Sequence, residues 1–69
     1  MNDERDSARL GVEASAWQLR KQMDELLAYL EHRSYPEAVA AVEPTTICAH
    51  RFLVAMDKLY TLNIFSAGA

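Results

Sequence analysis

Apolar residues recur at alternating intervals of four and three residues through the first half of the chain. These positions are Val12, Ala16, Leu19, Met23, Leu26 and Leu30. The spacing is typical of an α-helix that packs one narrow stripe of side chains along another helix. Most residues between these positions are charged or carry amides, as the solvated side of such a helix requires. The pattern therefore predicts a helix over about residues 7–33.

A second apolar line lies on a different side of the same predicted helix. It consists of Leu10, Ala14 and Trp17, again at intervals of four and three residues. We therefore expect the first half of this helix to be covered on two sides. We interpret Trp17 as part of a subunit interface. The alternative is an anchor for a foreign partner, because tryptophan is enriched at such sites.

Two prolines predict how the rest of the chain is divided. Ser34 is suited to cap a new helix, and Pro36 fits the first turn of that helix. Pro44 disfavours the helical conformation of Glu43, the residue before it. We therefore predict a capped turn and a short helix over about residues 34–43, a break at Pro44, and a last helix over about residues 45–62.

The predicted last helix is apolar around most of its circumference. One stripe comprises Cys48, Phe52, Ala55, Leu59 and Leu62, and an adjacent stripe comprises Ala49, Leu53, Met56 and Tyr60. Such a helix is covered on nearly all sides, and one other helix cannot do this. We predict an all-α fold, a helical hairpin with a short middle helical segment that assembles as a homodimeric four-helix arrangement. The residues assigned to its core and dimer interface are Val12, Ala16, Trp17, Leu19, Met23, Leu26, Leu30, Phe52, Leu53, Met56 and Leu59.

The size and the cysteine content of the chain favour the same assembly. Its 69 residues form one domain at most, and a single core of this size contributes only ~3–5 kcal/mol of net stability. One cysteine excludes an intrachain disulfide, and the Cys and His residues lack zinc-finger spacing. Association between copies is the remaining source of stability.

Composition and charge also bear on location and partners. No apolar run approaches the ~20 residues of a membrane span, and the acidic first residues are unlike a signal peptide. Together with the lone cysteine, these features favour a cytosolic protein that does not bind membranes. The net charge of −3 disfavours nucleic-acid phosphates and favours a partner with a basic face.

We assign no catalytic, cofactor or metal site. Cys48 and His50 are two residues apart, so on a helix their side chains point in different directions and cannot act as a pair. Leu19 to Asp24 looks superficially like the first helix of the helical chorismate mutases, but the chain is too short to complete their pocket. A helix-turn-helix DNA reader would need a basic outer face, and the last helix offers little beyond Arg51 and Lys58.

The run from Ala8 to Leu27 reads ARLGVEASAWQLRKQMDELL. This run, the chain length and the two-helix layout resemble the small anti-quorum-sensing proteins of temperate phages that infect Pseudomonas. The resemblance implies an all-helical homodimer that is made early in infection and acts in the host cytoplasm. It implies two host targets, namely the quorum-sensing activator LasR, bound at its DNA-binding domain, and the type IV pilus assembly ATPase PilB. Blocking PilB would remove a receptor for competing phages. The resemblance assigns no contact residues.

The connection between the long helices is the preferred candidate for partner binding. It contributes Tyr29, His32, Arg33, Tyr35, Glu37 and Glu43. Aromatic residues anchor interfaces, and the acids would steer the protein toward a basic domain. The line of Leu10, Ala14 and Trp17 is the alternative surface if the dimer leaves it open.

Overall fold

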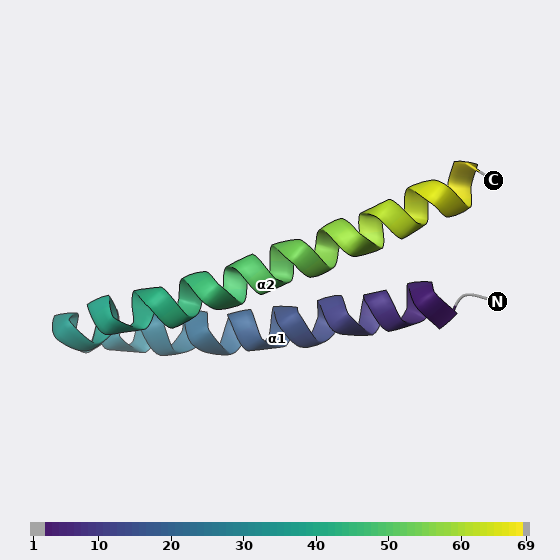
Figure 1. Ribbon diagram of the computed structural model, residues 1–69. Coiled ribbons are helices and arrows are strands. Elements are labelled where there is room, and N and C mark those ends of the chain that lie inside the picture. Colours follow the sequence, from purple (N-terminus) through teal and green to yellow (C-terminus); the bar gives the residue numbers. More distant parts are fainter. Residues whose placement is uncertain (1–2, 69) are drawn as a thin grey trace.

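The computed structural model describes the backbone of residues 3–68 and the side chains of residues 3–63. Within these residues the chain forms two helices, α1 (Asp3–Glu31) and α2 (Tyr35–Gly68), and no strand. The helices run antiparallel as a hairpin, with the turn at one end and both termini at the other (Figure 1). The molecule is a rod of 52 × 14 × 13 Å. The predicted all-helical fold is confirmed.

Helix α1 begins at Asp3, about one turn earlier than predicted. Its first turn carries Asp3, Glu4 and Asp6. Carboxylates at this end interact favourably with the unpaired N–H groups and the positive end of the helix dipole. The acidic start of the chain therefore belongs to the helix.

Helix α1 ends in a Schellman motif that turns the chain into α2. Arg33 has a left-handed backbone conformation with φ of 57°. The N–H of Arg33 donates to the carbonyl of Leu30 at 3.1 Å, and the N–H of Ser34 donates to the carbonyl of Tyr29 at 2.7 Å. The carbonyl of Ser34 accepts the N–H of Ala38 at 2.9 Å. Ser34 therefore occupies the N-cap position predicted for it, one residue before α2.

The predicted break at Glu43 and Pro44 does not occur, and there is no separate middle segment. Pro44 lies inside α2, where its missing N–H and its ring cost ~3 kcal/mol. Ala41 and Thr45, on either side of Pro44, are buried, while Pro44 is exposed. Burial of both flanking turns against α1 therefore holds the helix together through the proline. The end of α2, predicted near residue 62, extends to Gly68.

The helices pack through one line of side chains on each, which we call the seam. In α1 the seam comprises Arg5, Ala8, Val12, Ser15, Leu19, Gln22, Leu26 and Tyr29. In α2 it comprises Ala38, Ala41, Thr45, Cys48, Phe52, Ala55, Leu59 and Leu62. All of these side chains are buried or half-buried, and both lines alternate intervals of three and four, as in an antiparallel coiled coil. The first predicted stripe of the last helix is therefore the seam of α2.

The seam of α1 differs from the predicted heptad in half of its positions. Val12, Leu19 and Leu26 face α2 as predicted. The places assigned to Ala16, Met23 and Leu30 are taken by Ser15, Gln22 and Tyr29. In the half of the hairpin next to the turn, α1 carries the seam residues Gln22, Leu26 and Tyr29, and α2 carries the small seam residues Ala38, Ala41 and Thr45. The small partners leave room for long polar side chains in the seam.

Candidate interaction surfaces

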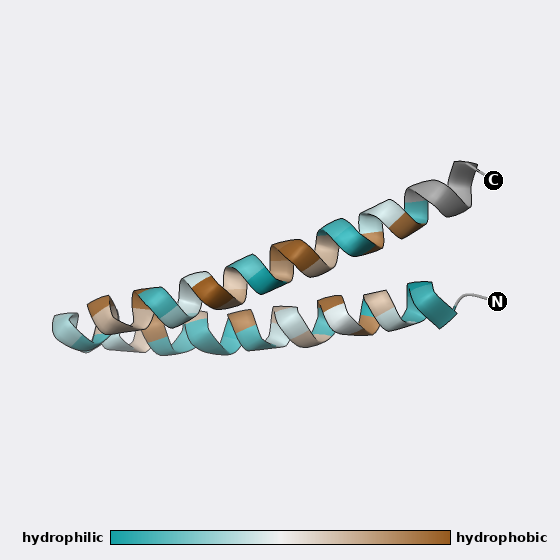
Figure 2. Cartoon of the chain, in the orientation of Figure 1, coloured by the Kyte–Doolittle hydropathy of each residue, from teal (hydrophilic) through white to brown (hydrophobic). Residues whose placement is uncertain are grey.

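One long side of the hairpin carries most of the exposed apolar residues. The positions directly beside the seam are its flanks. In an antiparallel helix pair, a flank of one helix lies on the same long side of the pair as the corresponding flank of the other helix. The apolar residues selected from one pair of flanks and the positions next to it are Ala16, Met23, Leu27 and Leu30 of α1 and Val39, Val42, Ala49, Leu53 and Met56 of α2. We call this set the apolar face. Figure 2 shows more strongly hydrophobic segments along α2 than along α1.

The opposite long side carries charged and amide side chains beside the seam. Gln18 and Arg51 line a shallow hollow there, beside the seam residue Cys48. Glu4 and Lys58 line another hollow near the open end. Each hollow is lined by residues that lie beside the seam in both α1 and α2. This supports the assignment of one flank of α1 and one flank of α2 to the same long side, which was used to define the apolar face. The two long sides therefore differ in their share of charged residues, although Ile47 and Val54 are exposed outside the apolar face.

Charged residues limit the apolar face at the open end of α1. Arg9 and Glu13 form an ion pair of 2.6 Å, with both side chains about half exposed. Exposed pairs of this kind, one helical turn apart, contribute ~0.3–0.5 kcal/mol. On α1 the apolar members of the face therefore lie between Ala16 and the turn, with Arg20 beside Ala16.

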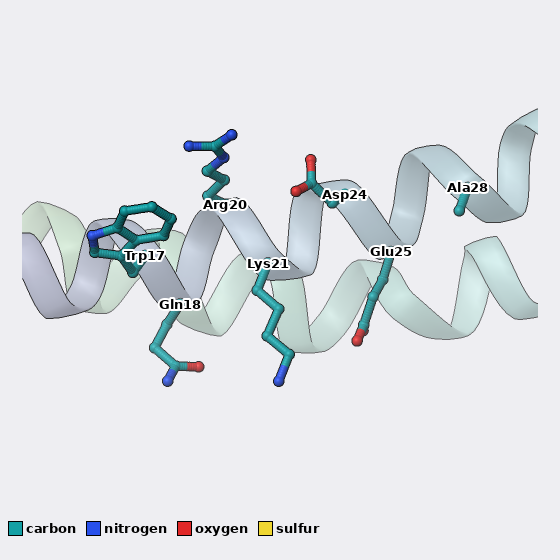
Figure 3. A pocket seen from close by; sticks show the side chains of 7 residues that line it. All are labelled: Trp17, Gln18, Arg20, Lys21, Asp24, Glu25 and Ala28. Atoms are coloured by element: carbon teal, nitrogen blue, oxygen red, sulfur yellow. The ribbon is translucent and has the colours of Figure 1, made fainter.

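Trp17 lies on the outer side of α1 and is 66% exposed. The guanidinium carbon of Arg20 lies 5.2 Å from the centre of its ring, a cation–π contact worth ~0.5–1 kcal/mol at an exposed site. Figure 3 shows Trp17, Arg20 and Asp24 on one side of α1 and Lys21 on the other. These residues line an open surface formed by α1 alone, so this is a ridge and not an enclosed pocket. Leu10 and Ala14, the other members of the predicted second line, are also exposed.

The predicted partner-binding residues do not all stay together. His32, Arg33, Tyr35 and Glu37 are exposed at the turn, and we call these four the turn cluster. Tyr29 is half-buried in the seam, so the fold itself uses much of its side chain. Because α2 continues through Pro44, Glu43 is exposed two helical turns along α2.

The residues assigned to the core and the dimer interface fall into two groups. Those in the seam are Val12, Leu19, Leu26, Phe52 and Leu59, all half-buried. Those exposed in the single chain are Trp17, Met23, Leu30, Leu53 and Met56, with Ala16 half-buried beside them. The hairpin itself does not bury the second group, and its burial in a dimer stays a prediction.

The apolar face also includes residues that the sequence reasoning did not assign. Leu27, Val39 and Val42 are 54%, 72% and 52% exposed. Leu27 lies one turn from the predicted Met23 and Leu30. The two valines extend the second stripe of the last helix backward past Pro44. The expected break at Pro44 concealed this continuation, which could have been found by following the stripe at intervals of three and four.

Cys48 and His50 are not brought together. Cys48 is half-buried in the seam, whereas His50 is exposed on another side of α2. Among the described residues, no three Cys, His, Asp or Glu side chains are grouped as metal ligands would be. No helix in this part of the chain is long and apolar enough to cross a membrane.

Comparison with known proteins gives no match to the chain among protein-family models, curated proteins or solved structures.

Proposed function

We propose that this chain is a homodimeric protein-interaction module that inhibits its target by covering a functional surface. The observation that carries the proposal is the contrast between the seam and the apolar face. Within the described residues the seam side chains are buried or half-buried against the other helix, whereas Met23, Leu53 and Met56 stay 40–63% exposed on one side. An exposed apolar surface of this kind is typical of a protein–protein interface, and a second copy of the same face would cover it.

The resemblance of residues 8–27 to anti-quorum-sensing phage proteins suggests the targets. We propose that the dimer binds the DNA-binding domain of LasR and prevents it from reaching DNA, and that PilB is a second target. The net charge of −3 supports a basic partner. Exposed Glu37 and Glu43 support it too, because acids at the contact surface speed association with a basic domain.

The assembly is tested by a pair of neighbouring substitutions. Leu53 lies on the apolar face and is 63% exposed, and Val54 lies on the outer side of α2 and is 56% exposed. Leu53→Glu places a charge where the second copy would pack, so we expect it to abolish the dimer. The matched control Val54→Glu is expected to keep the dimer mass in light scattering. A folded wild-type monomer at micromolar concentration would exclude the homodimer.

The inhibition is tested with a fluorescent DNA duplex bound by the LasR DNA-binding domain. Adding the wild-type protein should release the DNA and lower its fluorescence anisotropy, whereas the Leu53→Glu variant should not. A control without LasR tests the alternative of a DNA-binding regulator, since direct binding would raise the anisotropy of the free duplex. If the wild-type protein does not bind this domain, the proposed LasR target is wrong, while the dimer is tested independently.

A further inference from the structure

The outer surface of α1 carries a charge pattern whose sign changes halfway along it. The residues that line this surface form the ridge around Trp17, and they are Trp17, Gln18, Arg20, Lys21, Asp24, Glu25 and Ala28. All of them are exposed. In Figure 3, Arg20 and Asp24 lie along one edge of the ridge, and Lys21 and Glu25 lie along the other. Each edge therefore has a basic residue nearer the open end of the hairpin and an acidic residue nearer the turn.

The hairpin itself does not use these four charges. Among the described residues, Arg9 and Glu13 form an ion pair at a spacing of four residues, but the bases and acids of the ridge do not pair at the same spacing. The guanidinium of Arg20 instead lies over the ring of Trp17, 5.2 Å from its centre. The surface is formed by α1 alone, so α2 does not cover it. The ridge therefore presents its bases and its acids outward.

The charge pattern is complementary to a reversed copy of itself. When two copies of a helix pack antiparallel about a two-fold axis, each edge of one copy lies beside the same edge of the other. With the axis midway between Lys21 and Asp24, Arg20 meets Asp24 of the second copy on one edge. On the other edge, Lys21 meets Glu25 of the second copy. Each contact occurs twice, so every charge faces its opposite, whereas a parallel copy would place like charges together.

The sizes of the side chains at the two ends of the ridge favour the same register. With the axis in this place, Trp17 lies opposite Ala28 of the second copy. Trp17 is 66% exposed, and its large ring would cover the small exposed side chain of Ala28. The contact with Arg20 holds the ring on the outer side of α1 before any association. Charge and size are independent features, and both select one register.

From this complementarity we infer that a second copy of the chain docks antiparallel on the ridge, with the two-fold axis between Lys21 and Asp24. The apolar face does not line the ridge, so this contact is separate from the proposed homodimer and goes beyond it. Both contacts together would join dimers into larger assemblies. Exposed ion pairs contribute little and small interfaces are weak, so we expect a Kd of roughly 10–1000 µM at low salt.

The fluorescence of Trp17 tests the contact directly, because it is the only tryptophan of the chain. Raising the wild-type protein from about 5 to about 500 µM at low salt should move the emission to shorter wavelengths, since the ring leaves water. Adding about 0.5 M salt should reverse the shift, because it screens the ion pairs. An emission maximum that does not depend on concentration would overturn the inference.

A mixing experiment tests the pairing of charges along one edge. Lys21→Glu brings acids against acids between two copies, and Glu25→Lys brings bases against bases, so each variant alone should associate less than the wild type in sedimentation. In an equimolar mixture the reversed charges meet their opposites, and association should return. Both variants keep a net negative charge, so attraction between whole molecules does not explain a recovery. A mixture that associates no better than its components would contradict the pairing.

Lys58→Glu is the matched control for this experiment. It makes the same change of charge as Lys21→Glu, but Lys58 lies on α2 near the open end, outside the ridge. The control should associate like the wild type. If Lys58→Glu lowers association as much as Lys21→Glu does, only net charge matters and the docking register is wrong.

Leu53→Glu separates this contact from the proposed homodimer, since it removes only the apolar-face contact. Its Trp17 emission should still shift with concentration. A folded Leu53→Glu variant without that shift would overturn docking on the ridge. A wild-type protein that is a dimer at micromolar concentration and never shows the shift would leave the homodimer standing and exclude the ridge contact. A wild-type monomer whose emission shifts only at high concentration would do the opposite.

Discussion

Leu26 and Leu10 are leucines of the same helix in different surroundings. Leu26 is half-buried in the seam, while Leu10 is 55% exposed on the outer side of α1. We expect Leu26→Ala to cost ~2–5 kcal/mol, because it removes packed apolar side-chain atoms from the seam and leaves a gap there. The control Leu10→Ala should stay within ~0.5 kcal/mol of the wild type.

Thermal unfolding at one fixed protein concentration measures the difference between these leucines. In a chain of this size, 1 kcal/mol corresponds to roughly 4–8 °C in Tm. Leu26→Ala should therefore lower the Tm by about 8 °C or more, and Leu10→Ala by a few degrees at most. Equal shifts in the two variants would show that the seam does not carry the packing assigned to it.

At the residue scale, the hydrophobic pattern could predict part of the seam. Val12, Leu19 and Leu26 are its larger apolar residues in α1, and the heptad identifies them correctly. The pattern could not predict Ser15 and Gln22, because polar residues carry no apolar signal. Their position depends on which side of α1 meets the small residues of α2, and that is a property of the packed pair.

At the element scale, Pro44 is the residue whose low helix propensity disagrees most with its place inside a helix. It removes one hydrogen bond donor inside α2 and is itself exposed, so its side chain contributes little packing to the hairpin. Pro44→Ala restores the donor opposite the carbonyl of Ala40. We expect this change to stabilise the protein by ~1–3 kcal/mol, since proline costs ~3 kcal/mol relative to alanine but also restricts the unfolded chain.

The measurement for Pro44→Ala is the Tm at matched protein concentration, which should rise by several degrees. A suitable control is Glu43→Ala, because Glu43 is an exposed neighbour that keeps its backbone N–H. A lower Tm for Pro44→Ala would mean that the proline shapes α2 for packing, and that the restored hydrogen bond does not compensate for the changed shape.

The helix boundaries show how far local rules could predict the elements. The start of a helix directly after Ser34 depends on neighbouring residues alone, and its position was predicted correctly. Whether the helix continues through Pro44 depends on residues distant in sequence, because Ala41 and Thr45, on either side of Pro44, are buried against α1. Local propensity therefore predicted a break that tertiary packing overrides.

At the scale of the whole molecule, the hairpin separates surfaces that the sequence presents together. Both apolar stripes of the last helix were visible in the sequence, but only the structure shows that the stripe with Cys48 is used within the chain. The stripe with Leu53 is left exposed. Similarly, sequence proximity grouped Tyr29 with the turn cluster, although the antiparallel packing directs it into the seam.

The turn cluster and the ridge around Trp17 are competing contact surfaces for LasR. Tyr35 is 57% exposed at the turn, and Trp17 is 66% exposed on the outer side of α1. We expect Tyr35→Ala to weaken binding to the LasR DNA-binding domain about tenfold or more, as for an interface anchor. Trp17→Ala should change it little. Binding is measured by calorimetry, after light scattering has shown each variant to be a folded dimer.

The opposite result, loss of binding with Trp17→Ala alone, would move the contact to the ridge. No effect of either change would exclude both surfaces as the anchor.

Salt provides an independent test of the acids near the turn, since charges are screened over ~10 Å at 0.1 M salt. If exposed Glu37 and Glu43 face a basic domain, added salt should weaken binding by the wild-type protein. It should weaken binding less for a Glu37→Gln, Glu43→Gln variant, because neutral side chains of nearly the same shape leave less attraction to screen. An equal salt dependence in the two proteins would show that the acids near the turn do not contact the target.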